Sequence, residues 1–349
     1  MIKRITNALN RLSKLPKNRY LPFIKNKALA FVYKKIKSTK VAYPVSIMLE
    51  LTNKCNLTCT TCARGYDYGK QMNTGFMDEN CAKKIVDELW GYLYSIGLTG
   101  MGETFLYPNI KNIVDYIKAK NKNITIFVST NAMLPNFIEQ VAPLAGLIDK
   151  ILVSIDGLDD VYESIRQKAK FERLKSNLET LIKNCHNTST SITLNMVVTK
   201  ENYHQMADLV IFAKNVGVKY LGFTKFNLAA VTQIDKTYYD FYKSEEFLTA
   251  FDLLKETEKQ VKEVEVSYHT FDTNHSFQAC PFPWNNFYIT WDGYMPPCCA
   301  KPFPKELHFG NVFDSSVIEV LNSKEYRNWR QCWYENKSPA FCDKCHFIV

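Results

Sequence analysis

Three cysteines lie close together in the sequence, Cys55, Cys59 and Cys62, with the spacing CxxxCxxC. On one tight loop, three thiolates can bind three corners of a cubane iron–sulfur cluster and leave the fourth iron without a protein ligand. A structural zinc site would need four protein ligands, commonly as paired CxxC motifs, and no fourth Cys or His is adjacent. The spacing therefore favours a cluster with one iron open for chemistry.

Six of the eleven cysteines lie in a second group near the end of the chain, at Cys280, Cys298, Cys299, Cys332, Cys342 and Cys345. The surrounding sequence is rich in aromatic residues and proline and poor in long apolar periods, so this region is expected to need a stabilising staple. Clustered cysteines in a chain without a secretory signal favour metal binding over disulfides. From the residues alone, a tetrahedral zinc site here stays an open alternative.

The elements that must position these cysteines begin at residue 44. Apolar, β-branched segments predict strands at 45–51, 95–98, 124–129, 151–155, 192–198 and 219–224. Between them, helical periodicity predicts helices at 78–92, 109–120, 134–144, 161–184 and 202–216. Repeated strand–helix–strand units predict a parallel α/β sheet, and six of them predict a partial (β/α)6 barrel similar to an open TIM barrel. The first cysteine loop would lie at the carboxyl edge of this sheet, where such folds bind ligands.

We expect four parts along the chain. Residues 1–44 form a basic, helical N-terminal extension, and residues 45–230 form the barrel. Residues 231–270 form a linker with one helix, and residues 271–349 form a small Cys-rich domain.

The first forty residues contain twelve Lys and Arg and no acid, and the first carboxylate of the chain is Glu50. Apolar residues at near-helical spacing, interrupted by Pro16 and Pro22, permit two short amphipathic helices. Such a segment could attach to an anionic membrane or an acidic partner, or could be a solvated helix pair packed on the domain. No aromatic-interleaved basic sheet accompanies it, which disfavours nucleic acid. Lacking a signal peptide and any apolar run of spanning length, the sequence predicts a cytoplasmic protein, peripheral to the membrane if the basic segment binds it.

Beyond CxxxCxxC, further motifs follow at the ends of the second, third and fourth predicted strands, and together they resemble the radical S-adenosylmethionine (radical SAM) enzymes. The segment 100–103, Gly-Met-Gly-Glu, is similar to the family's Gly-Gly-Glu motif. The resemblance implies that Glu103 holds the methionine amino group and that Gly100 and Gly102 allow close backbone approach. It also implies that Ser154 and Arg166 contact the ribose and the methionine carboxylate. Two further cofactor-binding residues are expected at the end of the third strand, Thr130 and Asn131.

This resemblance also implies the chemistry. A 4Fe-4S cluster on Cys55, Cys59 and Cys62, reduced by a flavodoxin- or ferredoxin-type donor, would cleave S-adenosylmethionine to methionine and a 5′-deoxyadenosyl radical. That radical would abstract a hydrogen atom from the substrate. The protein would orient one C–H bond and exclude water.

The C-terminal region resembles the auxiliary-cluster domain called SPASM or, in its shorter form, Twitch. The similarity lies in a Cys, twelve residues, Gly293, four residues and a second Cys, followed by a distant CxxC. It implies one auxiliary 4Fe-4S cluster with four protein ligands, Cys280, Cys298, Cys342 and Cys345. Cys299 and Cys332 receive no role.

The substrate is the least determined feature. Our first expectation is oxidation of a small or saccharide-type molecule, assisted by the auxiliary cluster. Only 43 residues precede Pro44, too few for the winged-helix domain with which peptide-modifying members often hold a leader peptide. The alternative is a peptide or protein maturase, of the ribosomal-peptide or sulfatase-maturing type. A second alternative is a non-catalytic binding protein stabilised by an iron–sulfur cluster or zinc.

Overall fold

The fold is organised around one parallel sheet. The structure, a computed structural model, describes residues 15–268, 271, 277, 280 and 282–346. The sheet has eight strands in the order β7-β6-β5-β4-β3-β2-β1-β8, and each neighbouring pair is parallel. The strands are β1 Ser46–Leu49, β2 Ser95–Gly97, β3 Thr125–Thr130, β4 Lys150–Ser154, β5 Ser191–Val198, β6 Tyr220–Lys225, β7 Glu265–Ser267 and β8 Phe287–Ile289. Within the described residues β7 and β8 each pair on one side only, so the barrel is open, as the sequence predicts.

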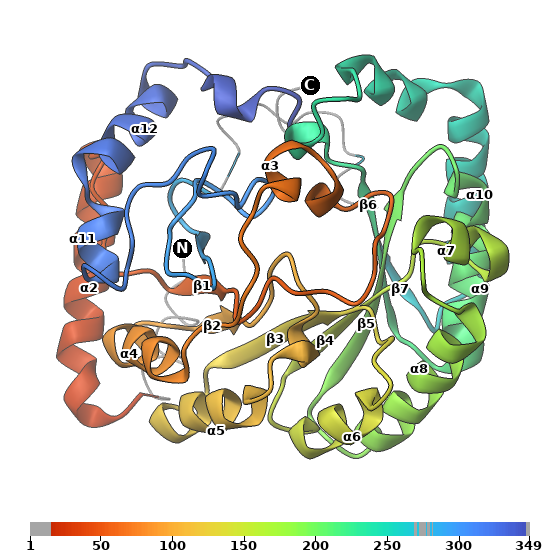
Figure 1. The fold of residues 1–349 in the computed structure, drawn as a ribbon, viewed down its shortest axis with the longest axis horizontal. Helices are drawn as coiled ribbons and strands as arrows, with labels where there is room; N and C mark the ends of the chain where they lie inside the picture. Colours follow the sequence, from red (N-terminus) through yellow and green to blue (C-terminus); the bar gives the residue numbers. More distant parts are fainter. Residues whose placement is uncertain (1–14, 269–270, 272–276, 278–279, 281, 347–349) are drawn as a thin grey trace.

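Helices cover the outer side of this sheet (Figure 1). They are α2 Tyr20–Lys35, α3 Asp67–Lys70, α4 Glu79–Leu89, α5 Ile110–Lys120, α6 Phe137–Val141, α7 Asp159–Ile165, α8 Phe171–Cys185, α9 Met206–Val216, α10 Glu245–Gln260, α11 Val317–Leu321 and α12 Lys324–Tyr334. Local signals fix several of the ends. Asp78 caps α4 by accepting from the amides of Asn80 and Cys81, and α9 ends at Gly217 in the left-handed region. The core lies between the sheet and these helices, with alternating residues of β3 and β4 buried.

All six predicted strands are present, as β1–β6, but the prediction missed the strand at each edge of the sheet, β7 and β8. β7 and β8 each contain three residues, too few for a period-two pattern to be recognised in the sequence. β8 comes from the predicted Cys-rich domain, yet it pairs with β1 in the register Ile47↔Phe287 and Leu49↔Ile289. The C-terminal region therefore extends the sheet of the barrel, while the domain limits given above stay a prediction.

The predicted helix at 161–184 is wrong as a single element. The structure has α7 and α8 there, separated by a turn in which Arg166 leaves helical geometry and Lys168 adopts a positive φ of 72°. At this break the Arg166 side chain pairs with Asp156. The predicted helix at 134–144 is shorter than expected, since α6 gives way to a 3-10 turn, Ala142–Leu144.

The predicted basic N-terminal extension contains the 16-residue helix α2. Pro22 lies in its first turn, where a proline removes no intrahelical hydrogen bond. The first of the two predicted short helices, before Pro16, lies outside the described residues. Within the described part of the chain, no helix is both long enough and apolar enough to cross a bilayer.

Candidate functional site

The loop after β1 is anchored by a buried carboxylate. Glu50 is 2% exposed, and its carboxylate accepts hydrogen bonds from the Met101 amide at 2.7 Å, the Tyr288 hydroxyl at 2.5 Å and the Trp291 amide at 3.3 Å. Burial raises the pKa of Glu50, although these donors oppose the rise. One side chain thus joins β1, the loop after β2 and the segment after β8.

The two glycines of the 100–103 motif are required by packing within the protein. A Cβ on Gly100 would lie 2.3 Å from Glu50 Oε2, and a Cβ on Gly102 would lie 2.5 Å from the carbonyl oxygens of Thr52 and Lys54. The absence of side chains therefore lets the loop after β2 press against the cysteine loop. The sequence-based explanation, close approach to a ligand, is not needed to account for these glycines, and their role toward a cofactor stays a prediction.

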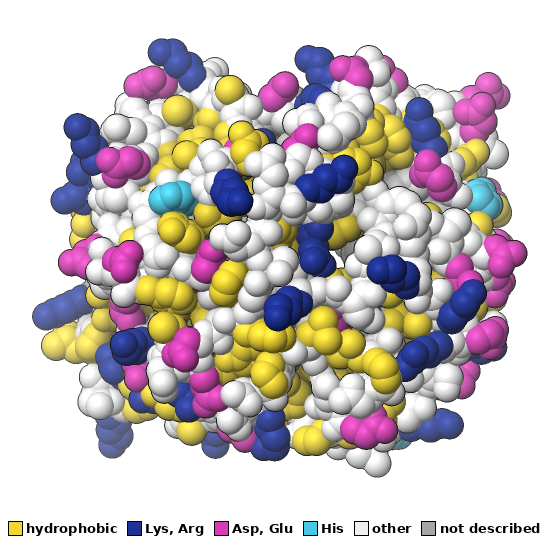
Figure 2. All heavy atoms as spheres, viewed as in Figure 1, with side chains coloured by type: hydrophobic (Ala, Val, Ile, Leu, Met, Phe, Trp, Pro, Cys, Tyr) yellow, Lys and Arg dark blue, Asp and Glu magenta, His cyan; other side chains and the backbone are white. Residues whose placement is uncertain are grey.

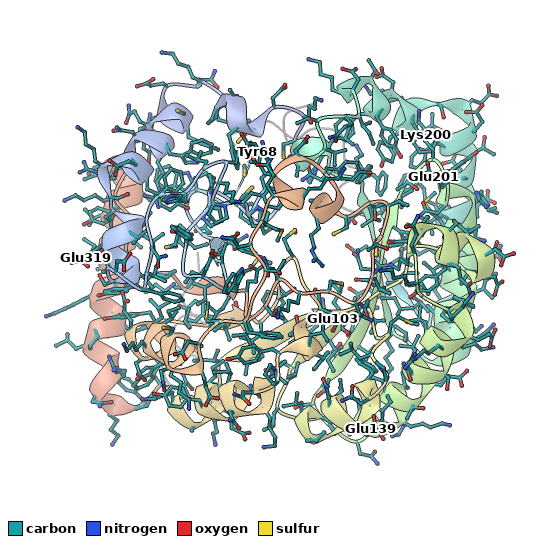
Figure 3. All side chains as sticks on the ribbon, in the orientation of Figure 1. Tyr68, Glu103, Glu139, Lys200, Glu201 and Glu319 are labelled. Carbon is teal, nitrogen blue, oxygen red and sulfur yellow. The ribbon has the colours of Figure 1, made fainter. Side chains whose placement is uncertain are left out.

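Glu103 lies near the middle of the ring of elements, whereas Glu139 and Glu319 lie at its periphery (Figure 3). Its carboxylate Oε1 accepts from the Thr130 hydroxyl at 2.8 Å and the Phe105 amide at 3.2 Å, and Oε2 accepts from the Asn131 amide at 2.7 Å. Burial raises the pKa of Glu103. An oxygen has two lone pairs, so Oε2 can accept one more hydrogen bond.

Asn131 connects this carboxylate to the cysteine loop. Its side-chain amide lies 3.7 Å from Cys55 Sγ and donates to Asn56 Oδ1 at 2.9 Å. The Glu103 amide also donates to the carbonyl oxygen of Lys54 at 2.8 Å. The structure therefore brings together the residues that the sequence predicts at the ends of the first three strands.

Arg166 reaches the site from the break between α7 and α8. Its Nη2 lies 2.9 Å from Asp156 Oδ2, and the carboxylate of Asp156 also accepts from the Val197 amide at 2.8 Å. Asp156 is fully buried, and the Arg166 side chain is 11% exposed. Within the described chain Arg166 Nε has no hydrogen-bond partner. Sequence reasoning selected Arg166 but not Asp156, although Asp156 stands in the motif 154–157 that pointed to this site.

The three thiols of the first motif are partly buried on one loop. Burial raises the pKa of Cys55, and it raises the pKa of Cys59 to about 11 although the positive charge of Arg166 acts in the opposite direction. The Thr60 amide donates to the Ile165 carbonyl at 2.9 Å, which ties the loop to the end of α7. Ser154 ends β4 in register with Asn195, and its predicted contact with a ribose is not tested by these contacts.

This arrangement fits a cluster and S-adenosylmethionine on chemical grounds. Three thiols lie on the loop after β1, Arg166 Nε is a buried donor without a partner in the described chain, and Glu103 Oε2 has a free acceptor position. An amino acid moiety presents an ammonium and a carboxylate, which these two groups complement. Among the described residues, no three His, Cys, Asp or Glu side chains converge on a point suited to one metal ion.

The cysteines of the second group also come together. Burial, together with the charges of Cys345 and Cys280, raises the pKa of Cys342 to about 12. The Cys299 thiol, whose pKa burial raises to about 12, also interacts with Cys280 and Cys345, and the Cys298 thiol interacts with Cys299 and Cys342. The four predicted ligands are therefore close enough to interact electrostatically, and Cys299 interacts with them too. The spacing from Gly293 selected Cys298 and gave Cys299 no role, although the Cys299 thiol interacts with the same cysteines.

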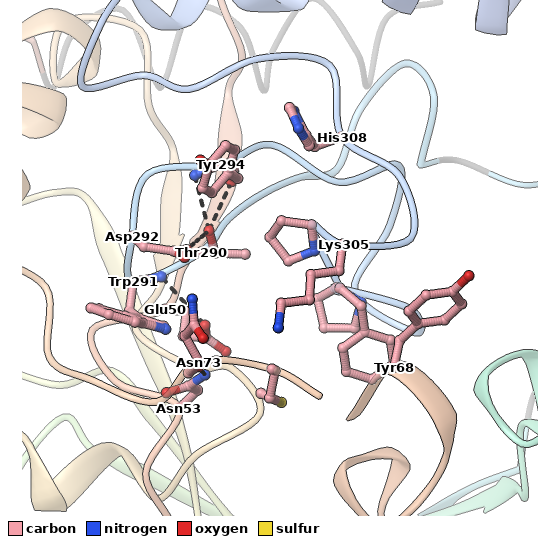
Figure 4. A pocket seen from close by; sticks show the side chains of 14 residues that line it. Glu50, Asn53, Tyr68, Asn73, Thr290, Trp291, Asp292, Tyr294, Lys305 and His308 are labelled. Carbon is pink, nitrogen blue, oxygen red and sulfur yellow. Dashed lines mark hydrogen bonds between the residues drawn. The ribbon is translucent and has the colours of Figure 1, made fainter. Parts of the chain in front are cut away.

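A cavity of about 290 Å³ is lined by residues from both cysteine regions (Figure 4). One wall comes from residues 50–73 after β1, including Asn53 and Tyr68, and the other comes from residues 290–308, including Trp291, Lys305 and His308. The Lys305 ammonium donates to the Gln71 carbonyl at 2.6 Å across the rim. The cavity was not predicted, because its walls lie more than two hundred residues apart in the sequence.

Models of known protein families match both cysteine regions of the chain. Residues 49–213 match the Radical SAM superfamily, and residues 280–346 match an iron–sulfur cluster-binding domain, SPASM. The tungsten-containing aldehyde ferredoxin oxidoreductase cofactor-modifying protein of Pyrococcus furiosus is 24% identical over 322 residues, covering 86% of each chain.

The subtilosin biosynthesis protein AlbA of Bacillus subtilis is 24% identical over 88% of this chain, but the match spans only 65% of AlbA. Among solved structures, SuiB of Streptococcus suis bound to S-adenosylmethionine has a TM-score of 0.67 at 16% identity, covering 91% of this chain and 76% of SuiB. SuiB has also been solved with its precursor peptide SuiA, with a TM-score of 0.66 at 15% identity, covering 91% of this chain and 73% of SuiB. At this identity the likeness is one of fold.

Proposed function

Since the chain belongs to the radical SAM superfamily and carries a SPASM iron–sulfur domain, we propose that it is a radical SAM enzyme that matures a peptide or protein. The observation that carries this proposal is the cavity whose walls come from both cysteine regions, because a polypeptide segment placed there would contact residues that flank both groups of cysteines. The peptide-related relatives, such as AlbA, support it. They favour this alternative over our first expectation of a small or saccharide substrate.

The cofactors of such an enzyme are two 4Fe-4S clusters and S-adenosylmethionine. In our proposal Cys55, Cys59 and Cys62 hold the first cluster. When bound, it supplies with S-adenosylmethionine a 5′-deoxyadenosyl radical that takes a hydrogen atom from the substrate. Glu103 Oε2 would accept from the methionine ammonium, and Arg166 Nε would donate to its carboxylate. Thr130, Asn131 and Asp156 hold these two groups in place.

Cys280, Cys298, Cys342 and Cys345 hold the auxiliary cluster in this proposal. Four protein ligands leave no open iron, so this site would transfer an electron or stabilise the domain instead of binding substrate. If the reaction is an oxidation, the auxiliary cluster would accept the electron that the substrate radical loses. A flavodoxin- or ferredoxin-type protein would supply the electron that reduces the first cluster. Both remain part of the proposal.

The cavity walls would position the peptide. Tyr68 and Trp291 offer flat apolar surfaces, Lys305 offers positive charge for a carboxylate of the substrate, and His308 offers a ring nitrogen for a hydrogen bond. Closure of the cavity around a peptide segment would exclude water from the reacting C–H bond.

The test is anaerobic turnover of the reconstituted enzyme with a reductant, S-adenosylmethionine and a panel of peptides encoded beside its gene. We expect one peptide to stimulate formation of 5′-deoxyadenosine and to change in mass. Tyr68→Ala should lower that stimulation, while slow cleavage without peptide is retained. Tyr220→Ala, at a tyrosine 42% exposed on β6 compared with 38% for Tyr68, is the matched control. If sugars or amino alcohols stimulated formation of 5′-deoxyadenosine and no peptide did, the result would contradict the proposal and favour small-molecule oxidation.

A further inference from the structure

Helix α2 has an unusually apolar outer face. Six of the fourteen exposed large hydrophobic side chains in the described chain lie on α2 or at its C-cap, namely Leu21, Ile24, Leu29, Phe31, Val32 and Ile36. Their exposed fractions run from 42% to 66%. We call these six residues the outer face of α2. Scattered exposed apolar residues are ordinary, but a contiguous group on one helix marks an interaction surface.

The opposite side of α2 is held firmly on the protein. Phe23 is buried and packs on Tyr94 with ring centroids 5.8 Å apart. Asn26, also buried, donates to the Tyr43 carbonyl at 3.0 Å and accepts from the Tyr43 amide at 2.9 Å. These contacts fix the rotation of the helix about its axis, so the outer face points away from the protein core.

Every charged residue of the segment that contains this face is basic. Five lysines lie on or just after the helix, at positions 25, 27, 34, 35 and 37, and residues 1–49 contain no Asp or Glu. By helical spacing, Lys25 and Lys35 lie among the apolar side chains. In the view of Figure 2, hydrophobic and basic side chains lie along the edge that α2 occupies in Figure 1, and acidic side chains lie beside them where Figure 3 labels Glu319 of α11.

We propose that the outer face of α2 binds the surface of an anionic lipid bilayer. A helix with Phe, Leu and Ile on one side and lysines beside them, lying on the outside of a folded domain, has the composition of an interfacial helix. Its lysines can extend their ammonium groups to lipid phosphates while their alkyl chains stay with the apolar side chains. The helix lies along the margin of the molecule, so a flat surface can reach it (Figure 1).

A protein partner fits the same face less well. The centre of a protein–protein interface is depleted in lysine, and here lysines interrupt the apolar stripe itself. A specific protein partner would also be expected to contact both acidic and basic side chains, whereas residues 1–49 contain only basic ones. A bilayer with anionic head groups needs no matched pattern, since each Lys or Arg adds a similar attraction.

Flotation of the full-length holoenzyme with lipid vesicles tests the proposal. At about 0.1 M salt, where surface charges are only partly screened, we expect binding to vesicles of phosphatidylglycerol and phosphatidylcholine and little binding to phosphatidylcholine alone. Replacing Lys25, Lys34 and Lys35 together by Gln should weaken binding on the order of a hundredfold. Replacing Ile24, Phe31 and Ile36 together by Ser should weaken it by more than about tenfold.

The controls remove equivalent groups elsewhere on the surface. For charge they are Lys236, Lys259 and Lys262, replaced by Gln, and for apolar area they are Ile211, Leu248 and Leu253, replaced by Ser. Neither control should change flotation. Failure of the native protein to float with anionic vesicles would overturn the proposal. So would a stable dimer that the Ser variant dissociates, or binding to an acidic polypeptide but not to vesicles, since these outcomes assign the face to a second copy or to a protein.

Discussion

The two cysteine regions are held in different ways. The loop with Cys55, Cys59 and Cys62 lies at the carboxyl ends of regular strands and is fixed by buried carboxylates that bond to backbone and side-chain donors. The region from Cys280 to Cys345 contributes one three-residue strand and two short helices, α11 and α12. Buried cations there bond to backbone carbonyls. The first site is therefore shaped by the barrel, whereas the second lacks a comparable scaffold and depends more on its metal.

Arg330 shows the second kind of support. It is fully buried, and its guanidinium donates to the carbonyls of Pro283 at 2.6 Å, Leu321 at 2.7 Å and Thr39 at 3.2 Å. Burial lowers the pKa of Arg330 to about 10. Lys301 acts similarly, with its ammonium 3.2 Å from the Phe341 carbonyl beside Cys342. These cations connect loops that no sheet or long helix joins.

The largest effect is expected when the cysteine ligands of each region are replaced, because the two regions should then differ in their sensitivity to protease. Cys342→Ala combined with Cys345→Ala should make the chain from about residue 270 onward sensitive to protease, because a structural metal site can supply most of the folding free energy of a core-poor segment. Cys55, Cys59 and Cys62 replaced together by Ala should leave that region protected and abolish S-adenosylmethionine cleavage. Iron analysis and limited proteolysis with mass spectrometry measure both. Equal protection of both variants would contradict the comparison.

Next in size is the loss of the buried cation. Arg330→Gln should destabilise the protein by about 3–5 kcal/mol, because a shorter neutral side chain leaves several buried carbonyls without a donor. Urea unfolding followed by tryptophan fluorescence measures this change, since Trp284 and Trp329 lie in the same region. Arg173→Gln, at an exposed position on α8, is the control and should change stability by less than about 0.5 kcal/mol. If both variants lost a similar free energy of unfolding, Arg330 would not connect these loops.

A smaller effect is expected from crowding the first site. Gly100→Ala places a Cβ against Glu50 and the Tyr288 hydroxyl, and overpacking of this kind costs about 1–3 kcal/mol. Gly65→Ala, which meets no atom within 4 Å, is the control. Thermal unfolding compares the two variants. If they were equally stable, the close contact between Gly100 and Glu50 would not constrain the loop.

An effect of similar size, on ligand binding instead of stability, concerns Glu103. Glu103→Gln keeps the side-chain shape, and in our proposal it should weaken S-adenosylmethionine binding by about 1.5–3 kcal/mol, the contribution of a hydrogen bond to a charged group. Glu103→Ala is the less informative change, because it would also leave the donors of Thr130 and Asn131 unpaired. Isothermal titration of the reconstituted protein measures the affinity. Unchanged affinity of the Gln variant would remove Glu103 from the binding site.

The amino-acid sequence by itself determined the parallel barrel. Strands and helices alternate along the chain, and each can be recognised within a short segment from its apolar residues, which recur with a period of about two in strands and about 3.6 in helices. It also indicated the first cysteine loop and the strand-end residues around it, since the carboxyl ends of parallel strands necessarily share one edge. The break after Ile165 was missed because the turn between Ile165 and Phe171 contains no Gly or Pro that would mark it in the sequence.

Only the tertiary structure decided how the two cysteine regions meet. The pairing of β8 with β1, the contact of Tyr288 with Glu50, and the cavity between residues 50–73 and 290–308 join parts of the chain more than two hundred residues apart. No local period encodes such contacts, since they arise when separate elements pack and bury one another's side chains. The outer face of α2 has the same origin, because a helix shows which of its apolar residues remain exposed only after one side has packed.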